Sequence, residues 1–255
     1  MNQEERRRFL IRRLLDEQPR YRDLELPSGE AEQRRLLRSL FNLRMPGGID
    51  GEFLTVQDEY LREETRRKGV TALAELTQVA PGRYLWRGDI TTLACDAIVN
   101  AANAGMTGCY QPCHSCIDNC IHTWAGIQLR NCCAELMEEQ GYEEPTGQAK
   151  ITPAFNLPCR YVIHTVGPIV QGRLTGRQEE QLASCYRACL ELAEEHGLSS
   201  VAFCCISTGV FGFPQGRAAE IAVKTVREYQ ANSMIEVIFN VFKDEDYAIY
   251  RALLG

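Results

Sequence analysis

From about residue 78, short apolar runs alternate with longer runs of helical spacing, and this alternation limits the fold more than any other feature. Continuous apolar strands alternating with helices are typical of a mostly parallel sheet covered on both faces. In such sheets, ligands bind beyond the carboxyl ends of the strands. The predicted strands are residues 83–86, 96–101, 160–166, 200–206 and 236–242, and the predicted helices are residues 120–140, 179–197, 216–230 and 244–254.

The first 75 residues differ from the rest of the chain. Apolar residues recur there at helical spacing in three segments, which are residues 7–18, 31–44 and 53–69. Their charged faces are most simply solvated surface. We therefore predict a helical extension over residues 1–75, packed on a main domain over residues 76–255.

Charge and hydropathy exclude several classes of protein. The net charge is −6, whereas a general nucleic-acid binder would be basic, so we expect no nucleic-acid partner. No window approaches the roughly 18 consecutive apolar residues of a membrane span. The charged N-terminus also lacks the apolar region of a signal peptide. We therefore expect a cytoplasmic protein without a membrane partner.

The strongest local signal is GCYQPCHSCIDNCIHTWAG, residues 108–126. In a chain without a signal peptide, its cysteines are interpreted as thiols and metal ligands. Cys109, His114 and Cys116 have the spacing C-x4-H-x-C and are soft ligands suited to zinc. Three ligands on one loop are typical of a catalytic zinc with an open fourth position. A metal-free cluster of reduced thiols is the alternative.

Several neighbouring residues allow two interpretations. Cys113 or Cys120 could supply a fourth ligand and close the site. Asp118 either complements the N-terminus of the following helix or acts as a base beside the metal. His122 is interpreted as a packed helix residue and His164 as a core histidine.

Two further segments carry polar groups at strand ends. DAIVNAAN (96–103) ends in the amides of Asn100 and Asn103, which suit sugar hydroxyls or, alternatively, a turn. ISTGVFGFPQGRAA (206–219) places small residues between a strand and a helix. Free backbone N–H groups in such a loop suit a phosphate, although a plain connecting loop is the alternative.

Taken together, these segments resemble the macrodomain family. Five motifs occur in the order of the family between about residues 84 and 242: RGDIT (87–91), DAIVNAAN (96–103), CIDNCIHTWAG (116–126), YVIHTVGP (161–168) and ISTGVFGFP (206–214). Residues 108–122 resemble the zinc-containing subgroup of macrodomain protein-ADP-ribose hydrolases, which also has an N-terminal helical extension. Ordinary macrodomains carry a glycine run where this chain has the Cys/His segment.

The resemblance implies a three-layer α/β macrodomain with a mixed, mostly parallel sheet, and a zinc-dependent hydrolase. The substrate would be an ADP-ribosylated protein, modified on Asp or Glu, and the product would be ADP-ribose. The implied roles are catalysis by Asp118 and Asn103; ADP-ribose binding by Asp89, Ile90, Asn103, Ser207, Thr208, Gly209, Val210, Phe211, Asn240 and Phe242; and Zn²⁺ binding by Cys109, His114 and Cys116.

Two other classes compete with the hydrolase. A reader module would bind ADP-ribose without cleaving it, and the same pocket would serve it. A zinc-stabilised structural or RNA-binding domain is the third class, which the acidic net charge disfavours. The acidic Asp118 and the candidate metal ligands favour the hydrolase.

Overall fold

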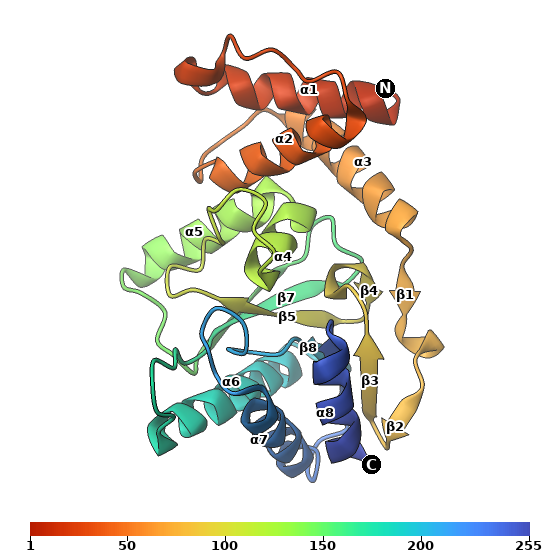
Figure 1. The fold of residues 1–255 in the computed structure, drawn as a ribbon, viewed down its shortest axis with the longest axis vertical. Coiled ribbons are helices and arrows are strands. Elements are labelled where there is room, and N and C mark those ends of the chain that lie inside the picture. Colours follow the sequence, from red (N-terminus) through yellow and green to blue (C-terminus); the bar gives the residue numbers. More distant parts are fainter.

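The computed structural model describes residues 1–255 and is built around a seven-stranded sheet of order β2-β3-β9-β8-β5-β7-β6 (Figure 1). The edge strands β2 and β6 run antiparallel to their neighbours, and all other neighbours are parallel. The strands are β2 (Gln78–Ala80), β3 (Arg83–Arg87), β5 (Ala97–Ala102), β6 (Ala149–Pro153), β7 (Tyr161–Val166), β8 (Ser200–Phe203) and β9 (Glu236–Val241). Two short strands, β1 (Thr71–Ala72) and β4 (Leu93–Ala94), pair separately.

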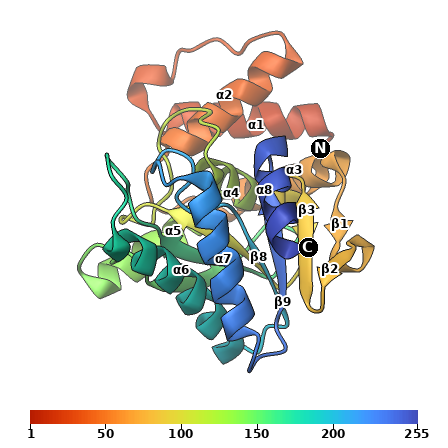
Figure 2. The same cartoon turned by 60° about the horizontal axis from the view of Figure 1, so that its bottom comes forward.

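Helices cover both faces of the sheet, which confirms the predicted layers. One face carries α4 (Ile117–Ala125) and α5 (Ile127–Gln140). The other carries α6 (Gly176–Glu195), α7 (Gln215–Tyr229) and α8 (Asp244–Leu254), which come forward in Figure 2. The central strands are apolar throughout because both of their faces are buried, as Ile98, Val162 and Val201 illustrate with 0% exposure.

Two predicted elements differ from the structure, and two edge strands were not predicted. Residues 120–140 form two helices rather than one, because Gly126 has φ 94° and ψ 175°, which ends α4 at Ala125. A Cβ on Gly126 would also lie 2.7 Å from Nε2 of Gln57, so glycine permits the close approach of the N-terminal helices. The strand predicted over residues 200–206 ends at Phe203, where the chain turns into a loop. The edge strands β2 and β6 were not predicted.

The N-terminal helices α1 (Gln3–Asp16), α2 (Glu30–Leu43) and α3 (Gly51–Lys68) pack on the α4–α5 layer (Figure 1). Twelve buried apolar residues form a core cluster separate from the 43-residue cluster around the sheet. Only Ile127 of this smaller cluster comes from the α4–α5 layer. The exact boundary between the helical extension and the main domain, placed between residues 75 and 76, stays a prediction. No helix in the structure has the length and apolar character of a membrane span.

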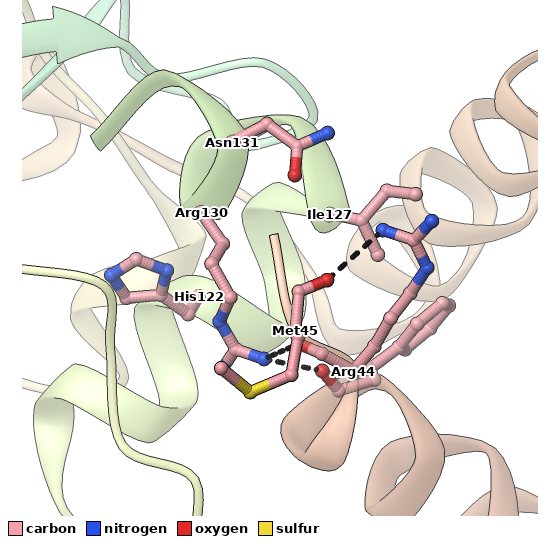
Figure 3. A pocket seen from close by; sticks show the side chains of 8 residues that line it. Arg44, Met45, His122, Ile127, Arg130 and Asn131 are labelled. Carbon is pink, nitrogen blue, oxygen red and sulfur yellow. Dashed lines mark hydrogen bonds between the residues drawn. The ribbon is translucent and has the colours of Figure 1, made fainter. Parts of the chain in front are cut away.

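Arg130 of α5 connects the extension to the main domain (Figure 3). Its Nη1 donates to the carbonyl oxygens of Phe41, Asn42 and Arg44 at 3.0, 2.9 and 2.5 Å. These carbonyls lie where α2 ends and have no partner inside that helix, so a cation stabilises them. The Nε of Arg130 donates to the carbonyl oxygen of Thr107 at 2.8 Å. The cavity beside Arg130 measures about 10 Å³, which is room for about one water rather than a ligand.

Candidate active site

The candidate site lies along the carboxyl ends of four neighbouring parallel strands. Asp89 follows β3, Asn240 lies near the end of β9, the 207–211 segment follows β8, and Asn103 follows β5. Since the sheet order is β3-β9-β8-β5, these groups form a row in the same order. The fold therefore brings together residues that are spread over more than 150 positions of the sequence.

Asp118 is buried in the first turn of α4, with 5% exposure. Its Oδ1 accepts a hydrogen bond from Nδ2 of Asn100 at 2.8 Å, and its Oδ2 accepts one from Nδ2 of Asn103 at 3.2 Å. Burial raises the pKa of Asp118 to about 6, and the two amides oppose that shift by stabilising the charged form. Nδ2 of Asn103 also lies 3.2 Å from the carbonyl oxygen of Gly108, which precedes Cys109.

Asn100 points into the protein rather than toward a ligand. It is completely buried, and its Nδ2 contacts both Asp118 and Nδ1 of His164, the latter at 3.1 Å. Of the two amides that the sequence singles out, Asn100 therefore positions the carboxylate. Asn103 lies at the strand end and is only partly buried.

A second cluster of nitrogen and sulfur groups lies beneath the site. Ligand atoms of His122, Cys133 and His164 are within 4.8 Å of one another, and all three residues are buried. Nδ1 and Nε2 of His164 contact Asn100 and Thr152 at 3.1 and 3.0 Å, as expected of a core histidine. Burial lowers the pKa of His164 to about 3 and that of His122 well below its usual range. We interpret this cluster as a packed set of neutral groups.

The predicted metal ligands lie together. Sγ of Cys109 is 3.7 Å from Nδ1 of His114, and the ligand atoms of Cys109, His114 and Cys116 are all within 4.8 Å of one another. Ligands 2.0–2.3 Å from a tetrahedral zinc are roughly 3.3–3.8 Å apart, so small shifts would let these three bind one ion. Two cysteines and one histidine are also a known ligand set of catalytic zinc sites. The residues present therefore fit zinc.

Cys113 and Cys120 face α2 and stand outside this group of ligands. Sγ of Cys113 lies 3.2 Å from Oγ of Ser39 and 3.4 Å from the carbonyl oxygen of Arg35. Sγ of Cys120 lies 3.6 Å from Nη2 of Arg38. Neither cysteine is placed as a fourth ligand in this arrangement.

The loop after β8 presents unpaired polar groups. Ser207 is buried with φ 65°, and its Oγ has no hydrogen-bond partner. A Cβ on Gly167 would lie 2.1 Å from that oxygen, so only glycine permits this packing. The N–H groups of Gly209, Val210 and Phe211 donate to no acceptor in the protein. Consecutive free N–H groups form an anion-binding concavity.

The opposite end of the row contains an ion pair that sequence reasoning missed. Oδ1 of Asp89 accepts hydrogen bonds from N and Oγ1 of Thr91, while its Oδ2 accepts from Nζ of Lys68 at 3.0 Å. Lys68 comes from α3, and its Nζ lies 3.4 Å from the ring centroid of Trp124. Burial lowers the pKa of Lys68, and Asp89 opposes that shift. Ile90 is buried, with 2% exposure.

Asn240 and Phe242 lie near Asp89 but differ in environment. Nδ2 of Asn240 donates to the carbonyl oxygen of Gly88 at 3.0 Å, so this amide holds the turn before Asp89. Phe242 is 77% exposed and so offers a ring face at the surface. Nothing in the sequence predicted that Asn240 would be buried and Phe242 exposed.

Residues 99–222 match the Macro domain family. A Protein-ADP-ribose hydrolase of Treponema medium is 60% identical, and the alignment covers 100% of both chains. A protein of the same name from Staphylococcus aureus (strain MSSA476) is 49% identical over 89% of this chain and 87% of its own length. The chain therefore belongs to the macrodomain family, as the motifs predicted.

Solved structures of macrodomains have the same fold. The Oceanobacillus iheyensis macrodomain with ADP has a TM-score of 0.63 and 39% identity, and the match covers 70% of this chain and 93% of that one. The Trypanosoma brucei macrodomain in complex with ADP-ribose has a TM-score of 0.66 and 29% identity, over 85% of this chain and 95% of that one. The predicted macrodomain architecture is thus confirmed.

Proposed function

We propose that this protein hydrolyses the bond between ADP-ribose and a modified protein side chain, with a zinc ion held by Cys109, His114 and Cys116. The observation that carries the proposal is the position of Asn103. Its amide contacts Asp118 and the carbonyl oxygen next to Cys109, so a sugar-binding amide, a buried acid and the candidate metal ligands share one site. The activity in the names of the Treponema and Staphylococcus relatives supports the same reaction.

The proposed orientation of ADP-ribose follows the order of these groups along the carboxyl ends of the strands, from β3 to β5. In the proposal, the adenine lies at Asp89 and Ile90, beside the exposed ring of Phe242. The diphosphate occupies the loop of residues 207–211, where three N–H groups lack an acceptor. The distal ribose then reaches Asn103, because β5 follows β8 in the sheet.

In the proposed reaction, a water molecule attacks C1 of the distal ribose. When bound, a zinc ion supplies Lewis-acid polarisation of a substrate oxygen. Asp118 orients a water and accepts its proton, while the water oxygen bonds to C1 and the bond from C1 to the side-chain oxygen breaks. The electron pair leaves with the substrate carboxylate, which gives ADP-ribose and an unmodified Asp or Glu. Asn100 and Asn103 hold the carboxylate of Asp118 in place, and such base catalysis contributes about 10²–10⁴-fold.

The test compares release with binding. Purified protein is incubated with substrates modified on Asp/Glu, on Ser or on Arg, and free ADP-ribose is measured. We expect release from the Asp/Glu-modified substrate. Tight binding of ADP-ribose in calorimetry without release from any substrate would establish a reader instead, and release only from the Ser- or Arg-linked substrate would overturn the proposed linkage.

The proposal includes a cytoplasmic location, with ADP-ribosylated proteins and ADP-ribose as partners. Cys109 and Cys116 bind zinc only as reduced thiolates, and a reducing compartment keeps them so. All twelve cysteines in the structure are free thiols, in keeping with this proposal. The net charge of −6 gives no reason to propose a nucleic-acid partner.

A further inference from the structure

Arg38 of α2 contacts the Cys/His segment at two places, at the metal ligand His114 and just after the metal ligand Cys116. Its Nη2 donates to the carbonyl oxygen of His114 at 2.7 Å. The same nitrogen donates to Oδ1 of Asn119 at 2.9 Å and lies 3.6 Å from Sγ of Cys120. One guanidinium therefore ties the loop that carries His114 to the first turn of α4, where Asp118 lies.

Asn42 repeats this connection one helical turn further along α2. Its Oδ1 accepts the backbone N–H of Cys113 at 2.9 Å, and its Nδ2 donates to Oγ1 of Thr123 at 2.9 Å. The Asn42 side chain is 1% exposed, and its bond to Thr123 is buried. Cys113 has φ 55°, which is uncommon for a residue with a side chain. The hydrogen bond to Asn42 helps to hold the loop in this conformation.

Asn119 extends the same support to the first metal ligand. Its Nδ2 donates to the carbonyl oxygens of Cys109 and Gln111 at 3.2 and 2.9 Å. The chain of contacts thus runs from Arg38 through Asn119 to Cys109, and directly from Arg38 to His114. Side chains that orient metal ligands typically change metal affinity by 10–100-fold when they are replaced.

We infer that Arg38 and Asn42 are positioning residues for the metal-binding loop, and that the N-terminal extension holds this loop in a zinc-binding conformation. The inference rests on the proposed zinc site. It gives the extension a role in the reaction, although the extension contributes none of the three ligands. Because Arg38 contacts none of the groups proposed to bind ADP-ribose, its loss should weaken zinc binding while nucleotide binding stays unchanged.

The test measures zinc affinity in the full-length protein by competition with a chromophoric chelator. The variants are Arg38→Met, which removes the donors, Arg38→Lys, which keeps the charge, and Asn42→Ala. Arg35→Met is the matched control, because Arg35 is on the same helix, is exposed, and makes no side-chain contact with the loop. Affinity for ADP-ribose and the melting temperature are measured on the same samples.

We expect Arg38→Met to weaken zinc binding by 10-fold or more, Arg38→Lys to recover part of that loss, and Arg35→Met to behave as wild type. A folded Arg38→Met protein with wild-type zinc affinity would overturn this inference and leave the zinc site standing. A lower melting temperature at unchanged zinc affinity would also overturn it, because that result defines a purely structural role. Failure of the wild-type protein to bind zinc would overturn the proposed zinc site, and this inference with it.

Discussion

Asp118→Asn tests the proposed catalytic role of the buried carboxylate. The substitution keeps the side-chain volume and removes the ability to accept a proton. Loss of base catalysis should lower kcat by about 10²–10⁴-fold, which is roughly 2.7–5.5 kcal/mol of barrier. Affinity for ADP-ribose should change by less than about threefold, a change well below 1 kcal/mol, since Asn103 and the 207–211 loop remain in place.

The structural cost of this substitution follows from its two hydrogen bonds. The carboxylate accepts from Asn100 at 2.8 Å and from Asn103 at 3.2 Å. An asparagine oxygen can replace only one of these acceptors, so one buried donor loses its partner at a cost of about 1–3 kcal/mol. A protein of ordinary stability tolerates that loss and stays folded.

Asp96→Asn is the matched control for Asp118→Asn. Asp96 directly precedes β5, at the opposite end of that strand from Asn103, and its Oδ2 accepts from the N–H groups of Ser199 and Ser200 at 2.9 and 3.1 Å. This variant should lose stability and keep its kcat. Single-turnover release of ADP-ribose measures the chemical step, and calorimetry measures binding. If the affinity of Asp118→Asn for ADP-ribose falls as far as its turnover while the protein stays folded, Asp118 is structural and the mechanism is wrong.

Three further predictions concern binding and stability. Ser207→Ala should weaken ADP-ribose binding about 5–10-fold in calorimetry without lowering the free energy of unfolding, because the buried hydroxyl has no partner in the free protein; a clearly destabilised variant would contradict this. Lys68→Met should lower the free energy of unfolding by about 1 kcal/mol in urea titrations, because Lys68 pairs with Asp89 and lies over the Trp124 ring; unchanged stability would show that these contacts contribute nothing. Gly126→Ala should cost more than about 2 kcal/mol in the same assay, because φ is 94° and Nε2 of Gln57 would lie 2.7 Å from the new Cβ; a neutral result would mean that the helix break is not required.

The pattern of apolar residues along the sequence was sufficient to predict the layers of this fold. The strands at residues 96–101, 160–166 and 236–242 are close to the observed β5, β7 and β9, because buried parallel strands leave a continuous apolar run. The break at Gly126 could not be predicted, since a glycine inside a helical pattern is often tolerated. Its φ of 94° and its contact with Gln57 depend on the packing of α3, in which Gln57 lies about 70 residues earlier in the sequence.

The site residues that lie in one short motif could be predicted from the sequence. The residues that reach the site from distant parts of the chain could not. Cys109, His114 and Cys116 lie within eight residues, and the structure brings their ligand atoms together. Arg38 and Lys68 reach the same site from the extension, across 76 and 21 residues respectively. Both α2 and α3 are rich in arginine and glutamate, and nothing in their sequence distinguishes Arg38 or Lys68 from the other basic residues.

Measuring the zinc dependence of ADP-ribose release tests whether Cys109, His114 and Cys116 form a metal site that the reaction needs. Release from an Asp/Glu-modified protein is measured before chelation, after removal of metal, and after readdition of zinc, with the zinc content of each sample determined separately. We expect release to stop when zinc is removed and to return when one equivalent is restored. Equal release from samples with and without zinc would contradict this expectation, because Cys109, His114 and Cys116 would then play no part in the reaction.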